Sequence, residues 1–336
     1  MKTIILQYLA VSAAILLALP AGASATCAGK DLIAAMPERD RAALASRAEA
    51  VPYPRGNFWR ATRDGSTIDL IGTMHLADPR HAALLETARP LIAAAEKVML
   101  EVTADETVRM QDAFSRDPGL GFIVEGPSLI EQLAPDEWQT LRQAMAARGV
   151  PAMLASRMRP FMVVATLSMP DCLLSDPAAA ANGLDRMIED EARRLGRPVA
   201  GLEGYEAMIR LFDRTDPELV LDMLRATLAQ QNMTEDYFAT LANAYFAGDH
   251  RLIWEFSQDT ATAAADIGFD PERLRAGMDA IHDLALVERN HAWMDRLLPL
   301  AEGRRLVVAV GAGHLAGDDG VLKLLERAGF TLTRLD

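Results

Sequence analysis

Two short segments at opposite ends of the chain share one pattern, and this pattern constrains the fold more than any other feature. The mostly apolar run 68–71 leads into Gly72-Thr-Met-His75, and the apolar run 306–310 leads into Gly311-Ala-Gly-His314. Each run predicts a strand, each glycine allows a tight turn, and a segment with helical spacing and then a further strand follow each histidine. The sequence therefore predicts an α/β fold whose central sheet is built from an N-terminal and a C-terminal strand–GxxH–helix–strand unit.

The segment between these units is mainly helical. Apolar residues recur at helical spacing in residues 128–147, 152–169, 182–195 and 217–231, and helices resume from 204 to about 300. A short strand near 198–202 interrupts them. Further strands are predicted at 57–62, which forms a hairpin with 67–72, at 98–102 and at 330–335. We expect a single domain, residues 26–336, with a helical cap over roughly residues 105–300.

The first 25 residues have the composition of a secretory signal peptide. Lys2 precedes an almost wholly apolar run, Ile4–Pro20, and the small residues that follow end in Ala23-Ser-Ala25, a pattern typical of a cleavage site. The alternative is an N-terminal membrane anchor, but the run is short for a span of about 20 residues. We therefore expect cleavage after Ala25, a secreted or periplasmic protein, and no membrane span in the mature chain.

Export would place two cysteines, Cys27 and Cys172, in an oxidising compartment. Only one pairing exists, so a disulfide between them is expected, and two separate buried thiols are the alternative. The formal net charge is -13, and an acidic surface repels phosphate backbones, which argues against a nucleic-acid partner.

Four side chains that could carry chemistry follow predicted strands. His75 and His314 come just past two of these strands, where open α/β sheets bind ligands. Glu101 follows the apolar residues 98–100, and Glu203 follows residues 199–202. Imidazole is the commonest metal ligand, and a carboxylate beside a buried strand needs a partner or an ion. Such a set suits Zn, Mn, Co or Fe. The alternatives are capping roles for the histidines, and helix caps or arginine pairs for the glutamates.

Two arginines are candidates for binding substrate or stabilising charge. Arg159 precedes a proline at a predicted helix start, and Arg289 lies beside Asn290 on the helix before the last buried strand. A guanidinium can hold a carboxylate through two hydrogen bonds or polarise a carbonyl. We expect Arg159 and Asn290 at the substrate and Arg289 in catalysis. For both arginines a salt bridge to Glu101, Glu203 or a surface acid is the alternative.

At these residues the chain resembles the TraB/GumN family, which includes the Tiki metalloproteases. The resemblance implies a fold related to the erythromycin-esterase-like and ChaN-like proteins, and an active site of His75, His314, Glu101 and Arg289. It also implies a metal-dependent peptidase, with Mn or Co as the metal. One departure is Phe161, where a tryptophan is expected. The matching stretches are Ile71-Gly-Thr-Met-His-Leu76, Met99-Leu-Glu-Val102, Arg159-Pro-Phe161, Gly183-Leu-Asp185, Pro198-Val-Ala-Gly-Leu-Glu203, Glu288-Arg-Asn290 with Trp293, and Ala309-Val-Gly-Ala-Gly-His-Leu315.

The sequence therefore predicts a metal-dependent hydrolase, a peptidase that acts on a peptide or protein substrate. In this hypothesis His75, Glu101 and His314 hold a divalent metal (Mn, Co or Zn), Glu203 shuttles a proton and Arg289 stabilises the oxyanion. One alternative is a non-enzymatic protein that binds a peptide, a metal or haem in the same pocket. Another is an esterase-type hydrolase that uses a histidine base and no metal. No oligomeric state is predicted.

Overall fold

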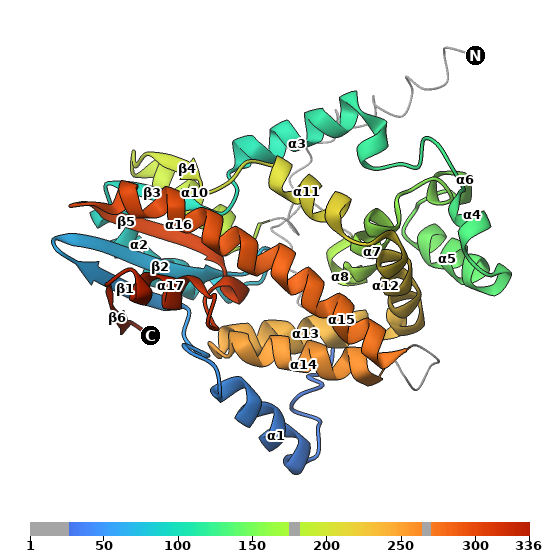
Figure 1. The fold of residues 1–336 in the computed structure, drawn as a ribbon, viewed down its shortest axis with the longest axis horizontal. Coiled ribbons are helices and arrows are strands. Elements are labelled where there is room, and N and C mark those ends of the chain that lie inside the picture. Colours follow the sequence, from blue (N-terminus) through green and yellow to red (C-terminus); the bar gives the residue numbers. More distant parts are fainter. Residues whose placement is uncertain (1–26, 175–181, 264–269) are drawn as a thin grey trace, which may run out of the picture.

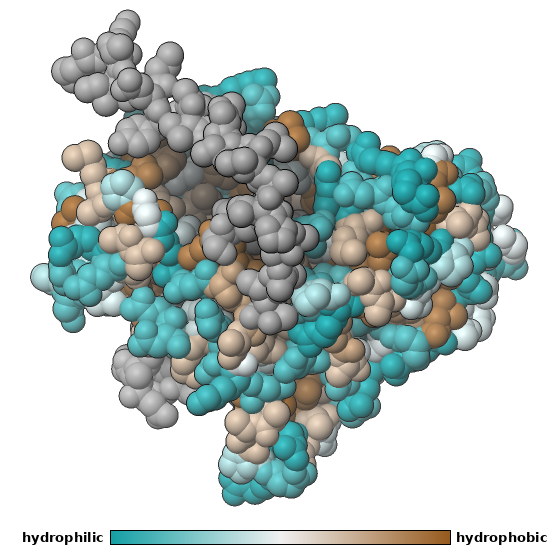
Figure 2. Space-filling view, turned by 180° about the vertical axis from the view of Figure 1, so that it is seen from behind, coloured by the Kyte–Doolittle hydropathy of each residue, from teal (hydrophilic) through white to brown (hydrophobic). Residues whose placement is uncertain are grey.

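The computed structural model describes residues 27–174, 182–263 and 270–336, so the predicted signal peptide, residues 1–25, lies outside the described residues. Within the described residues, one sheet carries helices on both faces, and a larger helical region, the cap, lies beyond one end of the strands (Figure 1). The predicted α/β class is confirmed. Figure 2 shows the opposite side of the molecule, where hydrophilic residues spread over the surface with smaller hydrophobic areas between them.

The sheet contains six strands among the described residues, in the order β4-β3-β5-β2-β1-β6. Strands β4, β3, β5 and β2 run parallel to one another, and β1 is antiparallel to both of its neighbours, β2 and β6. The C-terminal strand β5 lies between β3 and β2, so the prediction of a sheet assembled from both ends of the chain is confirmed. The strand bounds are Phe58–Arg63 (β1), Ser66–Thr73 (β2), Lys97–Leu100 (β3), Val199–Gly201 (β4), Arg305–Gly311 (β5) and Thr331–Arg334 (β6).

The central strand β5 is apolar throughout because both faces of the sheet are covered. Leu306, Val308 and Val310 face helices α16 (Glu288–Ala301) and α17 (Val321–Arg327). Val307 and Ala309 point to the other face and pack against α2 (His81–Ala94) and α10 (Leu184–Arg194). This sandwich of helix, sheet and helix fixes the ends of the strands in place.

The cap has a core of its own, formed by α5, α7, α12 and the short helices beside them. Its last helices, α15 and α16, form one long run that reaches from the cap to the sheet (Figure 1). The remaining elements are α1 (Glu38–Glu49), α3 (Ala104–Arg116), η1 (Pro118–Leu120), α4 (Leu129–Gln132), α5 (Pro135–Ala147), α6 (Ala152–Ala155), α7 (Pro160–Ser168), α8 (Asp171–Leu174), α11 (Glu206–Arg214), α12 (Pro217–Gln230), η2 (Gln231–Met233), α13 (Thr234–Phe246), α14 (His250–Ala263), α15 (Pro271–His282), η4 (Asp283–Val287) and η5 (Ala312–His314).

Prolines account for the largest differences between predicted and observed helix bounds. The predicted segment 128–147 is divided into α4 and α5, because Pro135 opens a new helix and the residue before a proline avoids helical geometry. Pro37 immediately precedes α1, which begins at Glu38. In contrast, Pro90 neither ends nor shortens α2, which continues to Ala94.

A disulfide joins Cys27 to Cys172 in α8, as predicted. It ties the first described residue to the middle of the chain across a separation of 145 residues. Such bonds persist in oxidising compartments, which is consistent with an extracellular or periplasmic location. Among the described residues, no helix combines the length and the apolar composition that a membrane span requires.

Candidate functional site

The four parallel strands bring their following residues to one edge of the sheet. Thr73 of β2 pairs with Gly311 of β5, and Leu100 of β3 pairs with Ala309 of β5, so all three strands stop at a similar level. Glu101 Oε2 lies 3.9 Å from His75 Nε2 and 3.7 Å from His314 Nε2. The two histidines from opposite ends of the chain therefore meet at one carboxylate.

Gly311 has no side chain and so leaves space between His75, Glu101 and His314. A Cβ at this position would lie 3.4 Å from Glu101 Oε2, 3.5 Å from His314 Cδ2 and 3.6 Å from His75 Nε2. All three side chains thus surround a single point. The backbone N–H of Gly311 also donates to Glu101 Oε2 at 3.1 Å, which fixes that oxygen between the imidazoles.

Gly72 allows the two turns to pack against each other. A Cβ here would come within 2.8 Å of Leu315 Cδ1, which is closer than side chains tolerate. The hydroxyl of Tyr245, from α13 in the cap, donates to the Gly72 carbonyl at 3.0 Å. The glycine of the first turn is therefore held between the second turn and the cap.

His75 is oriented by the start of α10. Its Nδ1 lies 3.1 Å from Asp185 Oδ1, and its side chain is 55% exposed. Helix α10 can approach this closely because Gly183 precedes it; a Cβ there would lie 2.3 Å from the His75 carbonyl carbon. The N–H of Leu184 donates to the Met74 carbonyl at 3.0 Å. The contact with Asp185 raises the pKa of His75 to about 9.

His314 is buried, and its Nδ1 lies 2.7 Å from Asn290 Oδ1. The Asn290 amide nitrogen donates to the Asp319 carbonyl at 2.8 Å, so its oxygen must accept and His314 Nδ1 must carry the proton. The lone pair of His314 is therefore on Nε2, facing Glu101. Trp293 packs on the ring at 4.4 Å between centroids. Burial lowers the pKa of His314 to about 4.

Arg289 joins the two glutamates. Its Nη2 donates to Oε1 of Glu101 and to Oε1 of Glu203, and its Nε lies 3.0 and 3.1 Å from the two oxygens of Glu203. Trp293 Nε1 donates to Glu203 Oε2 at 2.9 Å. Burial would raise the pKa of Glu101, but the charges of His314, Arg289 and His75 outweigh burial and lower the pKa to about 2.

A π-helical turn, η4, immediately precedes Arg289 in the chain. The N–H of Glu288 donates to the carbonyl of Asp283, five residues earlier. Arg289 Nη1 donates to the Ala285 carbonyl in this turn at 2.9 Å and lies 3.4 Å from His314 Nε2. Single π turns inside helices occur frequently at functional sites, because the wider turn changes the direction of the side chains that follow.

His75, Glu101 and His314 form a cluster at the strand ends, and this cluster offers the ligand types that a transition metal needs. The Nδ1 atoms of His75 and His314 face Asp185 and Asn290, so both Nε2 atoms point towards Glu101. Such second contacts commonly orient metal-binding histidines, and Arg289 Nη1 also approaches Nε2 of His314 at 3.4 Å. Ligands about 2.1 Å from a tetrahedral ion lie about 3.4 Å apart. The nitrogen–oxygen distances of 3.7 and 3.9 Å exceed this by a few tenths of an ångström. As they stand, no three such side chains among the described residues are close enough to hold an ion.

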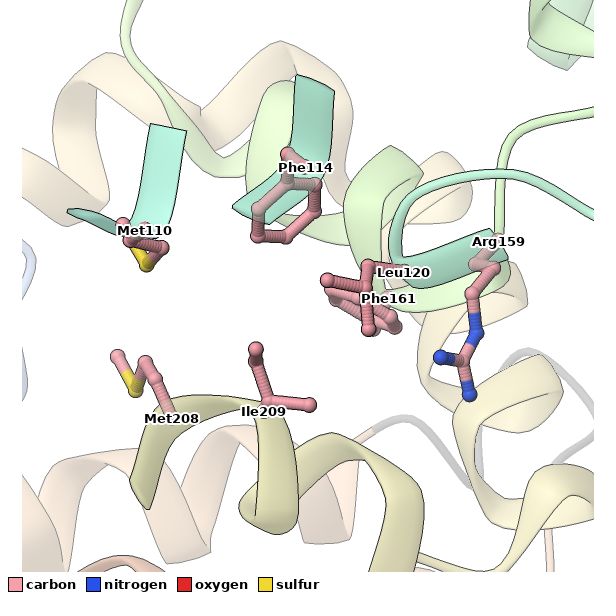
Figure 3. Close-up of a pocket in the computed structure, with 7 residues that line it drawn as sticks. All are labelled: Met110, Phe114, Leu120, Arg159, Phe161, Met208 and Ile209. Carbon is pink, nitrogen blue, oxygen red and sulfur yellow. The ribbon is translucent and has the colours of Figure 1, made fainter. Parts of the chain in front are cut away.

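Arg159 does not join this cluster. It forms a salt bridge with Asp213 at 2.9 Å and lies in a small pocket between α3 and α11 (Figure 3). Figure 3 shows Met110 and Phe114 from α3 opposite Met208 and Ile209 from α11, with Arg159 at one side; Leu120 and Phe161 complete the lining. The salt bridge that the sequence left open as an alternative is thus present for Arg159.

The other four histidines among the described residues lie outside this site and have structural contacts, and His81 and His250 are buried. His81 Nε2 donates to the Leu76 carbonyl at 2.9 Å. His250 Nε2 contacts the Gly56 carbonyl at 3.1 Å, and burial lowers the pKa of His250 to about 4. His291 contacts Asp319 at 2.9 Å, and His282 packs on Trp254.

Sequence analysis did not assign site roles to Asp185, Trp293 or Gly183. All three lie in stretches that match the family pattern, and this match was the one sequence feature that could have indicated a role for them. Their roles depend on contacts between distant segments, such as His75 with Asp185 and Glu203 with Trp293. Neither periodicity nor composition predicts such contacts. Asn290, expected at the substrate, instead has both ends of its amide engaged by His314 and Asp319.

Comparison with known proteins places the site inside a matched region. A family model described as the TraB/PrgY/gumN family matches residues 57–334. The chain is similar to a protein of Escherichia coli (strain K12) called "Uncharacterized protein YbaP", with 25% identity over 265 residues, which is 76% of this chain and 87% of that protein. A Shigella flexneri protein of the same name has the same identity and coverage. The family match contains every residue of the cluster.

Proposed function

This chain belongs to the TraB/PrgY/gumN family, and from this membership and the strand-end cluster we propose that it is a metal-dependent hydrolase that cleaves peptide bonds. The observation that carries the proposal is the convergence of His75 Nε2 and His314 Nε2 on one oxygen of Glu101. Two imidazoles and a carboxylate around one point are typical of hydrolytic metal centres.

In this proposal His75, His314 and Glu101 are the residues that hold the ion, with Mn, Co or Zn as candidates. A bound divalent ion supplies Lewis-acid chemistry, since it polarises a carbonyl and lowers the pKa of water. Asp185 and Asn290 hold the Nδ1 protons of the two histidines, so that both Nε2 atoms face the ion. For Glu101 to share an ion with each histidine, the nitrogen–oxygen distances of 3.7 and 3.9 Å would shorten by a few tenths of an ångström.

Arg289 provides a fixed positive charge beside this point. Glu101, Glu203 and the Ala285 carbonyl take most of its N–H groups and fix its position. In this proposal Arg289 therefore stabilises developing negative charge on a substrate carbonyl through its fixed charge and not through a free donor. Glu203 was predicted to shuttle a proton. Its oxygens accept from Arg289 Nε and Nη2 and from Trp293 Nε1, which suits it better to anchor Arg289 than to exchange a proton with water.

A peptide-hydrolysis assay tests the proposal. We expect purified protein to cleave members of a random peptide library when Mn²⁺, Co²⁺ or Zn²⁺ is added and to lose this activity in chelator. His75→Ala and His314→Ala should each lose activity at least about 100-fold and bind less metal. His291→Ala is the matched control, because His291 is exposed and lies on the same helix as Arg289. Equal inertness of wild type and His75→Ala towards the whole library would refute the proposal.

The pairing of His75 with Asp185 favours a second candidate, a hydrolase without a metal. A carboxylate on Nδ1 orients an imidazole and stabilises its protonated form. His75 would then act as the general base through Nε2 in its deprotonated form, so activity should rise towards its raised pKa of about 9. The two candidates differ in their response to chelator. Full activity in chelator together with loss of activity in Asp185→Asn would favour the histidine base over the metal centre.

A further inference from the structure

A cavity of about 670 Å³ lies in the cap beside the candidate site. Helices α12, α13, α14 and α15 form most of its wall, and Leu32 and Met36 from the N-terminal segment complete one part. Leu76, the residue after His75, also lines it. The volume is typical of a site for a small organic ligand, which occupies roughly 300–1,000 Å³.

Most hydroxyl groups of the wall are already engaged by the protein. Thr227 donates to the Met223 carbonyl at 2.8 Å and Thr234 to the Gln231 carbonyl at 2.9 Å, each within a helical turn. Ser257 donates to the Ile253 carbonyl at 2.9 Å and also contacts the Tyr237 hydroxyl at 2.6 Å. These groups therefore offer few hydrogen bonds to a ligand. The polar side chains that remain on the otherwise mostly apolar wall are Ser168, Gln230 and Asp259.

This chemistry selects the kind of ligand. A peptide backbone brings an N–H and a C=O group at almost every residue, and these need partners when buried. The engaged hydroxyls do not supply them, and three polar side chains cannot pair with a whole buried backbone. A hydrocarbon chain has no such requirement. The wall also contains four methionines, whose flexible side chains adapt to a chain of variable conformation: Met36, Met223, Met233 and Met278.

We infer that this cavity binds the unbranched acyl chain of an amphiphile, with the polar end of the ligand at Leu76. The position of Leu76 is fixed, because its carbonyl accepts from His81 Nε2 at 2.9 Å and the His81 ring packs against Phe246 of α13. A chain that ends at Leu76 has its polar group next to His75 along the backbone.

The inference also names a substrate class, and this part rests on the proposed hydrolase. A peptide that carries a fatty acyl chain can place the chain in the cavity and a neighbouring peptide bond at His75, Glu101 and His314. Hydrolysis of that bond consumes one water and yields a carboxylic acid and an amine. Binding of the acyl chain itself does not depend on hydrolysis.

Titration calorimetry with octanoate, decanoate, dodecanoate and tetradecanoate, below their micellar concentrations, tests the binding. We expect one saturable site with an affinity that rises about fourfold for each added methylene until the chain fills the cavity. Absence of saturable binding, or an affinity independent of chain length, overturns the inference. Tight binding of an apolar peptide without binding of the fatty acids would assign the cavity to a peptide and also overturn it.

Two variants of α12 locate the site. Ala226 lines the cavity, so Ala226→Trp fills it and should weaken dodecanoate binding at least about tenfold. Ala229 lies on the exposed side of the same helix, and Ala229→Trp is the control that should bind as wild type does. If Ala226→Trp does not fold, Met223→Gln keeps the side-chain size while it places an amide in the wall, and it should also weaken binding. Unchanged binding in the folded cavity variant would exclude this cavity.

A hydrolysis assay separates this inference from the proposed function. If both are correct, a dodecanoyl peptide should have a lower KM than the acetyl peptide of the same sequence, and Ala226→Trp should remove the difference while kcat for the acetyl peptide stays the same. Fatty-acid binding without any hydrolysis would refute the hydrolase and leave the cavity assignment intact. Hydrolysis of both peptides with equal KM, together with no fatty-acid binding, would refute only the cavity assignment.

Discussion

The two Gly-x-x-His turns have the same sequence pattern but different surroundings. His75 is 55% exposed, faces the carboxylate of Asp185, and has a pKa raised to about 9. His314 is buried, faces the neutral amide of Asn290, and has a pKa lowered to about 4. At neutral pH these shifts favour a charged His75 and a neutral His314. The pattern thus determines where each ring lies, whereas burial and the partner of Nδ1 determine its charge.

The largest expected effect on stability comes from Arg289, the cation that joins Glu101 and Glu203 beside the two turns. Arg289→Met leaves Glu101 and Glu203 buried without their cation, which should lower the free energy of unfolding by about 3–5 kcal/mol. Urea denaturation of the two proteins measures this loss. Arg275→Met, an exposed position on α15, is the control and should change stability by less than about 1 kcal/mol. Equal losses in both variants would show that Arg289 does not act through the buried glutamates.

The next largest effect is a loss of stability at low pH, which is expected of the buried His314 and not of the exposed His75. The folded pKa of His314 is about 4 and its ordinary value is 6.5, so below pH 6.5 the unfolded chain takes up a proton that the folded protein does not. Stability should therefore fall as pH drops from 6.5 towards 4, by up to about 3 kcal/mol. The groups around His314 are Glu101, Arg289, His75 and His282.

Urea denaturation of chelator-treated protein across this pH range measures the loss. His314→Gln should reduce the slope of stability against pH, and His250→Gln should do the same, because the pKa of His250 is also lowered to about 4. The double variant should have the flattest profile. A slope that persists unchanged in His314→Gln would contradict a buried, neutral His314.

A third experiment exchanges the partners of the two turns. Asp185→Asn removes the charge from His75 and should lower its pKa from about 9 towards 6.5. Asn290→Asp adds a charge at His314 and should raise its pKa from about 4. Shifts of roughly 1–3 units are expected, since an adjacent opposite charge has this effect. Imidazole chemical shifts followed by NMR during a pH titration give both values. If the exchange leaves both pKa values in place, burial alone sets the difference between the turns.

The sequence could predict the common position of the turns but not the difference between them. The apolar runs before Gly72 and Gly311 predicted two buried strands, and parallel strands bring their ends to one edge, so the meeting of His75 and His314 followed from local patterns. The partners could not be predicted in the same way. Asp185 reaches His75 across more than a hundred residues, through the close approach of Gly183 to the first turn.

The role of Arg289 shows the same limit. The sequence predicted a charged side chain near the sheet edge and left a salt bridge to Glu101 or Glu203 open. The structure has both salt bridges at once, because the π turn η4 and the helix α16 place the guanidinium between two strand ends. A helical pattern in the sequence does not reveal an extra residue in one turn, and so the direction of Arg289 could not be predicted.

The smallest expected effect is the contribution of the His75–Asp185 pair to stability, in the turn whose histidine is exposed. The folded pKa of His75 is raised, so its interaction with Asp185 contributes its full stability below pH 6.5 and loses it as pH rises through about 9. Because the ring is 55% exposed, solvent screens this interaction and its contribution should stay below about 1 kcal/mol. Unfolding of wild type and Asp185→Asn at pH 6 and pH 10 measures it: the two proteins should differ slightly at the lower pH and converge at the higher one. A difference that grows towards pH 10 has the wrong sign for a charged His75 and would make the two turns more alike than their surroundings suggest.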